Sequence, residues 1–209
     1  MGIKLSYAIT VCNEFEEIQR LVSFLLENKR RQDEIIILYD ESNGDFKIEE
    51  YLRSVSINGE LNWHKDKFNH NFADWKNKLT SLCNGDYIFN IDADEIPHKS
   101  LLKSLPDLLE SNREVDVITI PRINTVEGLT PTHIAKWGWV VNEKGWVNWP
   151  DYQARVYKIN SDIKWTGHVH ETLTGHKGFS FLPLQEEWAL YHPKTIQKQE
   201  KQNNYYNNI

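Results

Sequence analysis

The sequence predicts an α/β fold, with an open and mainly parallel sheet flanked by helices. Two observations predict this class. Strand-length apolar runs alternate with segments whose apolar residues recur at helical spacing, in the order strand, helix, strand. The run at residues 34–39 is almost continuously apolar, as expected of a parallel strand covered on both faces. A chain of 209 residues is long enough to build one such domain around a sizeable core.

The first elements establish the alternation. Residues 3–10 form a short apolar strand, and Asn13 is placed to cap the helix that follows, with Glu16 three residues later. Residues 34–39 form the second strand, which ends in a polar turn at residues 40–45. The first helix has apolar positions at helical spacing: Ile18, Leu21, Val22, Leu25 and Leu26.

The alternation continues with a candidate strand at residues 61–64 and a helix at about residues 71–83, which Gly85 is placed to terminate. Its apolar stripe comprises Phe72, Trp75, Leu79 and Leu82. A strand at residues 86–91 follows, and Ser100 is placed to cap a third helix. That helix carries five leucines: Leu101, Leu102, Leu105, Leu108 and Leu109. This order implies right-handed crossovers between parallel strands.

The second half changes character after a strand at residues 115–120. Residues 124–149 are rich in Trp, Gly and Thr without clear periodicity, which predicts a loop-rich region over the mouth of a crevice. Residues 152–157 alternate and predict a strand. The segment after Lys194 is rich in Gln, Lys and Asn, which is typical of a solvated helix or a disordered end.

Composition excludes several classes of protein. The net charge is −6 with acids and bases interspersed, so nucleic acid is not an expected partner, although a local basic groove stays open. The two cysteines, Cys12 and Cys83, do not suggest a disulfide scaffold and favour a reducing compartment. We find no signal-peptide pattern and no apolar run of the length that a membrane span needs. We therefore expect a cytoplasmic protein without a membrane span.

The triplet Asp92-Ala93-Asp94, followed by Glu95, stands where the strand at residues 86–91 ends. Side chains two apart on a strand share a face. Two carboxylates presented together suit Mn²⁺ or Mg²⁺, which can hold a diphosphate. The alternative for so short a motif is a solvated acidic turn.

Polar residues also follow the first two strands, at residues 10–14 and 40–42. Ligands of open α/β sheets bind beyond the carboxyl ends of the strands. Three acid-bearing strand ends would therefore face one crevice, and this convergence favours a nucleotide site over the acidic turn.

Tryptophan is abundant, and five of the eight lie between residues 137 and 165. Indole rings stack on sugar faces, so Trp137, Trp139 and Trp149 are candidates for an acceptor-binding platform. The alternative is that these tryptophans are anchors of the core and its loops.

Taken in order, these motifs resemble family 2 glycosyltransferases with a GT-A fold. The resemblance rests on Thr10-Val11-Cys12-Asn13-Glu14, Asp40, Asn84-Gly85-Asp86-Tyr87 and Asp92-Ala93-Asp94-Glu95. Residues 150–157 and His168-Val169-His170-Glu171 are similar to a branch of the family whose members often modify cell-surface glycans. The resemblance covers residues 3–192.

The resemblance implies a nucleotide-diphosphate sugar donor, a Mn²⁺ or Mg²⁺ cofactor and inversion at the anomeric carbon. The acceptor would be a glycan, a lipid-linked molecule or another hydroxyl compound. Residues 1–209 would form a single GT-A domain, with a nucleotide-sugar-binding half at residues 1–121, an acceptor and catalytic half at residues 122–193 and a polar tail at residues 194–209.

The resemblance also assigns residues at the strand ends. Thr10, Val11, Glu14 and Asp40 would hold the base and ribose, Asp92 would lie near the ribose or a metal-bound water, and Asp94 would ligate the metal. The full set that we expect to bind the nucleotide sugar is Thr10, Val11, Asn13, Glu14, Asp40, Lys78, Asp92, Ala93 and Arg155. The turn at residues 39–45 lacks a second Asp that often follows the first in this family, which leaves the donor base open.

Inverting transfer also needs a base for the acceptor hydroxyl. We expect Glu171 in this role because it comes from the second half, and Asp151 is the alternative; Glu95 is expected to support the metal site. The expected metal ligands are Asp94, Asp92, His170 and His192. The histidines favour zinc hydrolysis less, since the paired-histidine spacing of helical metalloproteases is missing from the sequence. Arg155 would contact the diphosphate or the acceptor, or pair with a nearby acid.

Three other functions remain open from the sequence. The first is a non-catalytic module that binds sugars or nucleotides through its tryptophans. The second is a nucleotidyltransferase, which should carry a Gly-rich basic loop after the first strand; residues 11–16 have no such composition. The third is a transferase that glycosylates modified DNA bases, which strong salt-dependent duplex binding would support.

Overall fold

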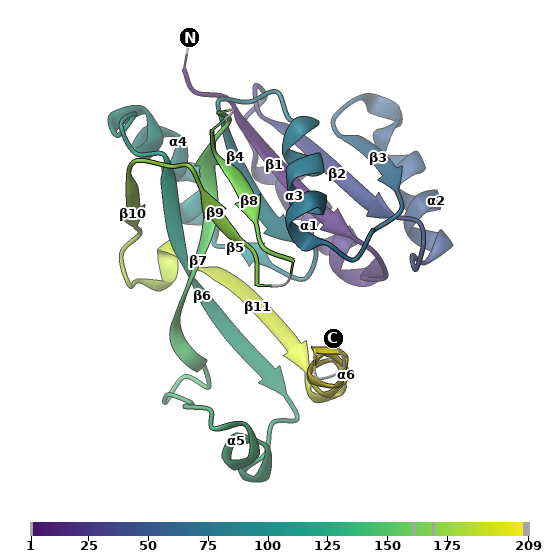
Figure 1. Ribbon diagram of the computed structural model, residues 1–209, viewed down its shortest axis with the longest axis vertical. Coiled ribbons are helices and arrows are strands. Elements are labelled where there is room, and N and C mark those ends of the chain that lie inside the picture. Colours follow the sequence, from purple (N-terminus) through teal and green to yellow (C-terminus); the bar gives the residue numbers. More distant parts are fainter. Residues whose placement is uncertain (1, 161, 169, 207–209) are drawn as a thin grey trace.

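A computed structural model describes residues 2–160, 162–168 and 170–206, with side chains as far as Asn204. Val169, within the predicted His168–Glu171 motif, and residues 207–209 of the predicted tail lie outside the described residues. The described chain forms a mixed α/β structure around a large, mostly parallel sheet, which confirms the expected α/β class with an open, mainly parallel sheet flanked by helices (Figure 1). The strand order is β3-β2-β1-β4-β7-β6-β11-β5, and β10 also pairs with β6.

The first half of the sheet contains β1 (Leu5–Val11), β2 (Glu34–Asp40), β3 (Asn62–Asp66) and β4 (Tyr87–Asp92). These four strands are parallel and confirm the predicted alternation. The connecting helices are α1 (Phe15–Asn28), α2 (Phe46–Val55) and α3 (Phe72–Ser81), and α4 (Lys99–Ser111) follows β4 after the short β5 (Ile96–Pro97). A single 3-10 turn, η1 (Ser56–Asn58), extends α2.

Both faces of this half of the sheet are covered because successive side chains alternate. Leu5, Tyr7 and Ile9 of β1 pack with buried residues of α1, α2 and α4. Ala8, between them, faces α3 and packs near Trp75. The nearly continuous apolar strands are therefore buried from both sides, as the sequence predicts.

Three of the predicted helix signals are wrong in detail. The N-cap of α1 is Glu14 rather than Asn13, and the N-cap of α4 is His98 rather than Ser100. Gly85 lies beyond the C-cap of α3, which is Leu82. Its lack of a side chain instead allows the turn before β4 to pack closely against Ser6 of β1. A Cβ atom there would lie 2.7 Å from the hydroxyl oxygen of Ser6.

The second half contains more regular structure than expected. β6 (Val117–Glu127) and β7 (Val147–Lys158) pair antiparallel, and α5 (Pro131–Trp137) lies between them. The loops predicted over residues 124–149 are therefore wrong for the ends of these strands and for α5. Pro131 begins α5, and Thr130 and His133 form its capping box. The far ends of β6 and β7 extend with α5 as an arm from the body of the sheet (Figure 1).

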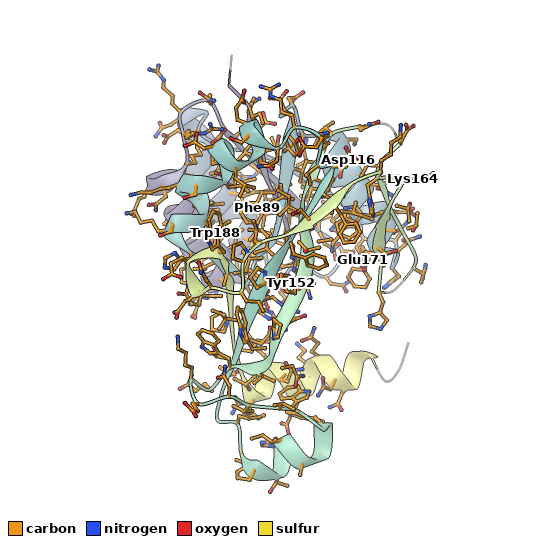
Figure 2. All side chains as sticks on the ribbon, turned by 90° about the vertical axis from the view of Figure 1, so that its left-hand side faces the viewer. Phe89, Asp116, Tyr152, Lys164, Glu171 and Trp188 are labelled. Carbon is orange, nitrogen blue, oxygen red and sulfur yellow. The ribbon has the colours of Figure 1, made fainter. Side chains whose placement is uncertain are left out.

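The remaining elements complete the second half. β8 (Lys164–Thr166) and β9 (Thr172–Thr174) form a hairpin, and β8 contacts α3. After β10 (Phe179–Phe181) and η2 (Glu186–Trp188), β11 (Leu190–Thr195) runs parallel to β6. The predicted tail forms α6 (Ile196–Tyr206), which lies with the arm below the body, while Phe89 lies within the body (Figure 2). Within the described ranges, every helix is too short or too polar to cross a membrane.

Candidate active site

The ends of β1, β2 and β4 lie side by side, as predicted. Thr10 of β1 is opposite Leu38 of β2 on one side and Asp92 of β4 on the other. Ala93 is buried directly after Asp92. The acidic triplet therefore stands beside the polar end of the first strand.

Two acids at these strand ends hold the loops together. The Glu14 carboxylate accepts hydrogen bonds from the backbone N–H groups of Cys12 and Asn13 at 2.9 and 3.0 Å. Asp40 is buried and accepts from the backbone N–H groups of Ser42 at 2.9 Å and Phe68 at 3.1 Å. Of the other residues expected to bind the nucleotide, Val11 is buried and Asn13 is exposed.

The thiol of Cys12 completes the surroundings of Asp40. Burial, reinforced by the Asp40 carboxylate, raises the pKa of Cys12 to about 12, so the thiol stays protonated. It donates to Oδ2 of Asp40 at 3.5 Å. Asp40 thus connects the segments that follow β1, β2 and β3, and its role in binding a nucleotide stays a prediction.

Arg155 of β7 forms ion pairs with two acids, one at the end of β4 and one in the turn that follows it. Its Nη2 lies 2.5 Å from Oδ2 of Asp92 and 2.5 Å from Oε1 of Glu95, and Arg155 and Glu95 are 3% and 0% exposed. Glu95 also receives Arg122 at 3.0 Å and the backbone N–H of Asp92 at 3.1 Å. Buried charges persist when they are paired in this way. Of the open alternatives for Arg155, the structure shows pairing with nearby acids.

These contacts keep Asp92 ionised. Burial acts to raise its pKa, but Arg155 and the more distant Lys76 outweigh burial and hold the pKa well below its usual range. The Asp92 side chain remains 35% exposed, so the carboxylate still reaches solvent.

Asp94 turns towards β11 instead. Its Oδ2 lies 3.3 Å from Nε2 of His192 and 3.9 Å from Nζ of Lys194. Burial acts to raise the pKa of Asp94, but His192 and then Lys194 lower it overall. His192 is buried, and its Nδ1 lies 2.6 Å from Oδ1 of Asn124 on β6.

The four predicted metal ligands are not gathered into one set. Within the part of the chain that the structure describes, no three His, Cys, Asp or Glu side chains are grouped closely enough to hold a metal ion. Asp94 and His192 do form a pair, whereas His170 lies in the turn between β8 and β9 with a positive φ of 57°. Asp92 points to Arg155.

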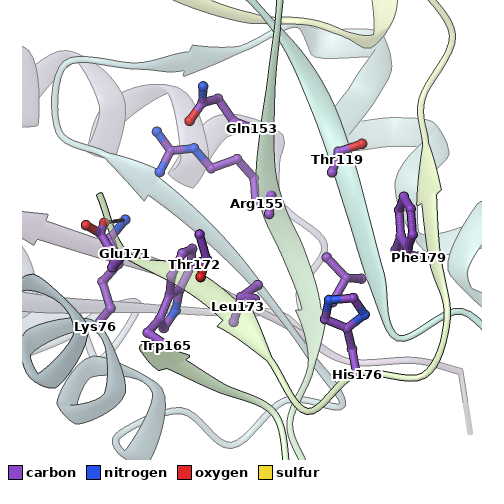
Figure 3. A pocket seen from close by; sticks show the side chains of 12 residues that line it. Lys76, Thr119, Gln153, Arg155, Trp165, Glu171, Thr172, Leu173, His176 and Phe179 are labelled. Atoms are coloured by element: carbon purple, nitrogen blue, oxygen red, sulfur yellow. Dashed lines mark ion pairs between the residues drawn. The ribbon is translucent and has the colours of Figure 1, made fainter. Parts of the chain in front are cut away.

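A pocket of about 420 Å³ lies between α3, β7 and the β8–β9 hairpin (Figure 3). Glu171 and Lys76 form an ion pair of 2.5 Å at its wall, and the Lys76 ammonium lies 4.3 Å from the centre of the Trp165 ring. Arg155 and Gln153 line the same pocket. Glu171, the expected base, and Arg155, which pairs with Asp92, therefore line the same pocket.

Lys76 is a site residue that the sequence analysis missed. The expected lysine, Lys78, pairs with Asp66 at the end of β3 and does not line the pocket. Helical spacing does not separate the two lysines. Lys76 is four residues after Phe72 and three before Leu79, and Lys78 is three residues after Trp75 and four before Leu82, so the sequence pattern does not single out Lys76.

Asp151, the alternative base, is bonded on both carboxylate oxygens. Oδ2 accepts hydrogen bonds from Arg122 at 2.7 and 2.9 Å and from Asn124 at 2.8 Å, and Oδ1 accepts one from Gln153 at 2.7 Å. Burial acts to raise the pKa of Asp151, but Arg122 and these donors lower it overall. A carboxylate so fully engaged is a weak proton acceptor, which favours Glu171.

The predicted tryptophan platform belongs to the arm. The rings of Trp137 and Trp139 lie 4.6 Å apart, and Trp137 also stacks on His133 at 5.2 Å. Trp149 meets Trp146 at 4.9 Å. The tryptophan that lines the pocket is Trp165. An acceptor role for the arm stays a prediction.

Comparisons with known proteins identify the family. The sequence profile of glycosyl transferase family 2 matches residues 6–188. No curated protein sequence gives a significant match. Similar solved structures include S. aureus TarS 1–349, with a TM-score of 0.63 and 16% identity over 91% of this chain and 60% of TarS 1–349.

Two further crystal structures of TarS 1–349 show the same likeness. The complex with UDP has a TM-score of 0.63 and 15% identity, over 91% of this chain and 60% of that one. The complex with UDP-GlcNAc has a TM-score of 0.60 and 15% identity, over 93% and 59%. At these identities the likeness concerns the fold, and this chain spans about 60% of the TarS 1–349 chain. The family match over most of the sequence shows that the chain belongs to glycosyl transferase family 2.

Proposed function

We propose that this glycosyltransferase moves a sugar from a nucleoside diphosphate donor to a hydroxyl acceptor, with a divalent metal and with inversion at the anomeric carbon. The observation that carries the proposal is the pocket where Glu171 lies near Arg155, which in turn holds Asp92 at the end of β4. Arg155 therefore contacts the acidic strand end through Asp92 and lines the same pocket as Glu171, the proposed base.

The donor class follows from the strand ends and from the structural neighbours. Thr10, Asp40 and Asp92 stand at the carboxyl ends of β1, β2 and β4, which is the edge where open α/β sheets bind nucleotides. TarS 1–349 has been crystallised with UDP and with UDP-GlcNAc. UDP sugars are therefore the first donors to test for this protein.

Asp94 and His192 fit a divalent cation. A carboxylate oxygen and an imidazole nitrogen 3.3 Å apart are ligand types that Mn²⁺ accepts, and the remaining ligands would be donor oxygens and water. Bound there, the cation would neutralise the charge that develops on the departing diphosphate. Asp92 would stand beside this pair, oriented by Arg155.

Glu171 would take the acceptor proton. The acceptor oxygen bonds to the anomeric carbon while the bond from that carbon to the diphosphate oxygen breaks. The bonding electrons leave with the diphosphate, and the hydroxyl proton passes to the Glu171 carboxylate. Because Glu171 enters the pocket from the segment before β9 and the acidic triplet follows β4, base and leaving group can occupy opposite sides of the sugar, as inversion requires.

The test compares E171Q, D94A and a control, E187Q, at an exposed glutamate. Donor hydrolysis and transfer are measured with UDP sugars and Mn²⁺, and donor binding by thermal shift. We expect E171Q to bind donor and to lose roughly 10²- to 10⁴-fold in transfer. D94A should lose the Mn²⁺-dependent turnover, and E187Q should behave as wild type.

The same assay separates the rival functions. Full transfer by E171Q would move the base to Asp151, and full Mn²⁺-dependent turnover by D94A would contradict the metal assignment. Stabilisation by sugars without turnover of any donor would indicate a non-catalytic binding module. Strong salt-dependent binding of duplex DNA would instead favour an acceptor in DNA.

A further inference from the structure

We propose that Asn124 is a positioning residue that fixes the His192 ring with its proton on Nδ1, so that the lone pair of Nε2 faces Asp94. This inference rests on the proposed function in one respect, the cation held between Asp94 and His192. The hydrogen-bond chain that orients the ring stands on its own contacts. It runs from Asp151 through Asn124 to His192 and crosses three strands, β7, β6 and β11.

Strand register places the members of this chain in a row. Asp151 of β7 is opposite Arg122 of β6, and His192 of β11 is opposite Asn124 of β6. Arg122 and Asn124 are two residues apart on one strand and so share a face. The register between β6 and β7 shifts between Arg122 and Asn124, and the Asp151 carboxylate accepts hydrogen bonds from both side chains at this irregularity.

The first link determines the orientation of the Asn124 amide. Oδ2 of Asp151 already accepts two N–H bonds from Arg122, and an ionised carboxylate can only accept hydrogen bonds. The amide atom 2.8 Å from this oxygen must therefore be the donor, Nδ2. Interchange of the amide nitrogen and oxygen would set two acceptors against each other.

The second link determines the tautomer of His192. With Nδ2 of Asn124 on Asp151, Oδ1 lies 2.6 Å from Nδ1 of His192. A carbonyl oxygen can only accept, so Nδ1 must carry the proton. In the neutral ring, Nε2 is then unprotonated.

The third link explains why this tautomer matters. Nε2 lies 3.3 Å from Oδ2 of Asp94, so a neutral ring turns a lone pair towards a carboxylate oxygen. Two acceptors at this distance repel unless a positive charge lies between them, which is either a proton on Nε2, so that the ring becomes a cation and donates to Asp94, or a bound metal ion. His192 is 8% exposed, so solvent does not separate the two groups freely. A metal-binding histidine is commonly oriented through its other nitrogen in this manner.

The inference gives Asp151 a definite task. Asp151 anchors the chain that aims His192, and this accounts for the four hydrogen bonds that occupy both of its oxygens. Lys194, 3.9 Å from the same oxygen of Asp94, supplies positive charge there when no other cation is bound.

Nuclear magnetic resonance of the whole protein tests the tautomer without donor, metal or turnover. Long-range ¹H–¹⁵N correlations of ¹⁵N-histidine protein are recorded at alkaline pH, and the His192 signals are assigned by their loss in H192Q. We expect the pattern of a ring protonated on Nδ1. A ring protonated on Nε2 would overturn the inference.

Binding of Mn²⁺ alone tests the consequence. Free Mn²⁺ is measured by electron paramagnetic resonance for wild type, N124A and a control, N112A, which removes an amide that bonds to the carbonyl oxygen of Leu108 at the end of α4. We expect N124A to weaken binding roughly 10- to 100-fold and N112A to bind as wild type. Equal binding by N124A and wild type would contradict the role of Asn124. An inactive wild-type enzyme with the expected tautomer and Mn²⁺ binding would refute only the proposed function.

Discussion

Lys76 and Glu171 connect the two halves of the chain at the level of single residues. Lys76 comes from α3 and Glu171 from the segment before β9, yet their side chains are 12% and 14% exposed and lie 2.5 Å apart. The pair could not be predicted from the sequence because its two residues are far apart along the chain. The residue type of Glu171 was predicted for the base, whereas its partner is given only by the packing of β8 against α3.

We expect K76M to reduce transfer because Glu171 loses the group that holds it at the pocket wall. Removing one partner of a mostly buried pair also costs about 3 kcal/mol of stability. The matched control is K144M, since Lys144 likewise pairs with a carboxylate, Glu186, and lies 4.5 Å from a tryptophan ring, but is 62% exposed. Steady-state kinetics and urea denaturation of both variants provide the check; similar losses in the two would argue against a positioning role for Lys76.

At the scale of elements, helices and strands were predicted best where the residues at the hydrophobic period are also the residues buried in the core. The strands and helices from β1 to α4 follow the predicted order, because each presents an apolar face to a layer above or below the sheet. α2 was missed: it has only two buried positions, Ile48 and Leu52, and begins at an Asp45 cap within a segment that reads as polar. The arm was missed because α5 buries none of its side chains.

Gly85 illustrates a constraint between elements. A Cβ atom at this position would lie 2.7 Å from Oγ of Ser6 and 2.9 Å from the carbonyl oxygen of Lys4. We expect G85A to lower the free energy of unfolding by about 1–3 kcal/mol, since the turn into β4 would be pushed away from β1. G178A is the control, because its nearest neighbour would be 3.4 Å away. Equal thermal stability of the two variants would show that the turn relaxes freely.

At the scale of the whole molecule, the candidate site is assembled from separate strands. Asp94 follows β4, Arg155 lies on β7, Asn124 on β6 and His192 on β11. Buried charges of both signs are thus concentrated where these strands meet, although burial alone would disfavour them. Their mutual pairing predicts a dependence of global stability on pH.

The sign of that dependence follows from the lowered pKa values of Asp92, Asp94 and Asp151. Burial acts to raise each pKa, and Arg155, His192 and Arg122 respectively outweigh it. A folded-state pKa below the unfolded value of about 3.9 gives stability that is present at neutral pH and lost as pH falls below about 4.

We therefore expect D92N to be less stable than wild type at neutral pH and to lose less stability in acid, so that the two curves converge at low pH. D107N, at an exposed position, should keep the wild-type profile. Chemical denaturation at a series of pH values measures both. Parallel curves for D92N and wild type would show that Asp92 does not titrate differently on folding.

The sequence by itself determined the sheet class, the order of the first elements, the strand ends that carry acids and Glu171 as the expected base. These features are local: hydrophobic period sets which face is buried, and parallel connections bring the carboxyl ends of strands to one edge. Only the tertiary structure decided that Lys76 rather than Lys78 enters the pocket, that Arg155 pairs with Asp92, and that Asn124 aims His192 at Asp94. The physical reason is that these contacts depend on the register between β6, β7 and β11 and on the packing of β8 against α3, which join residues distant in sequence.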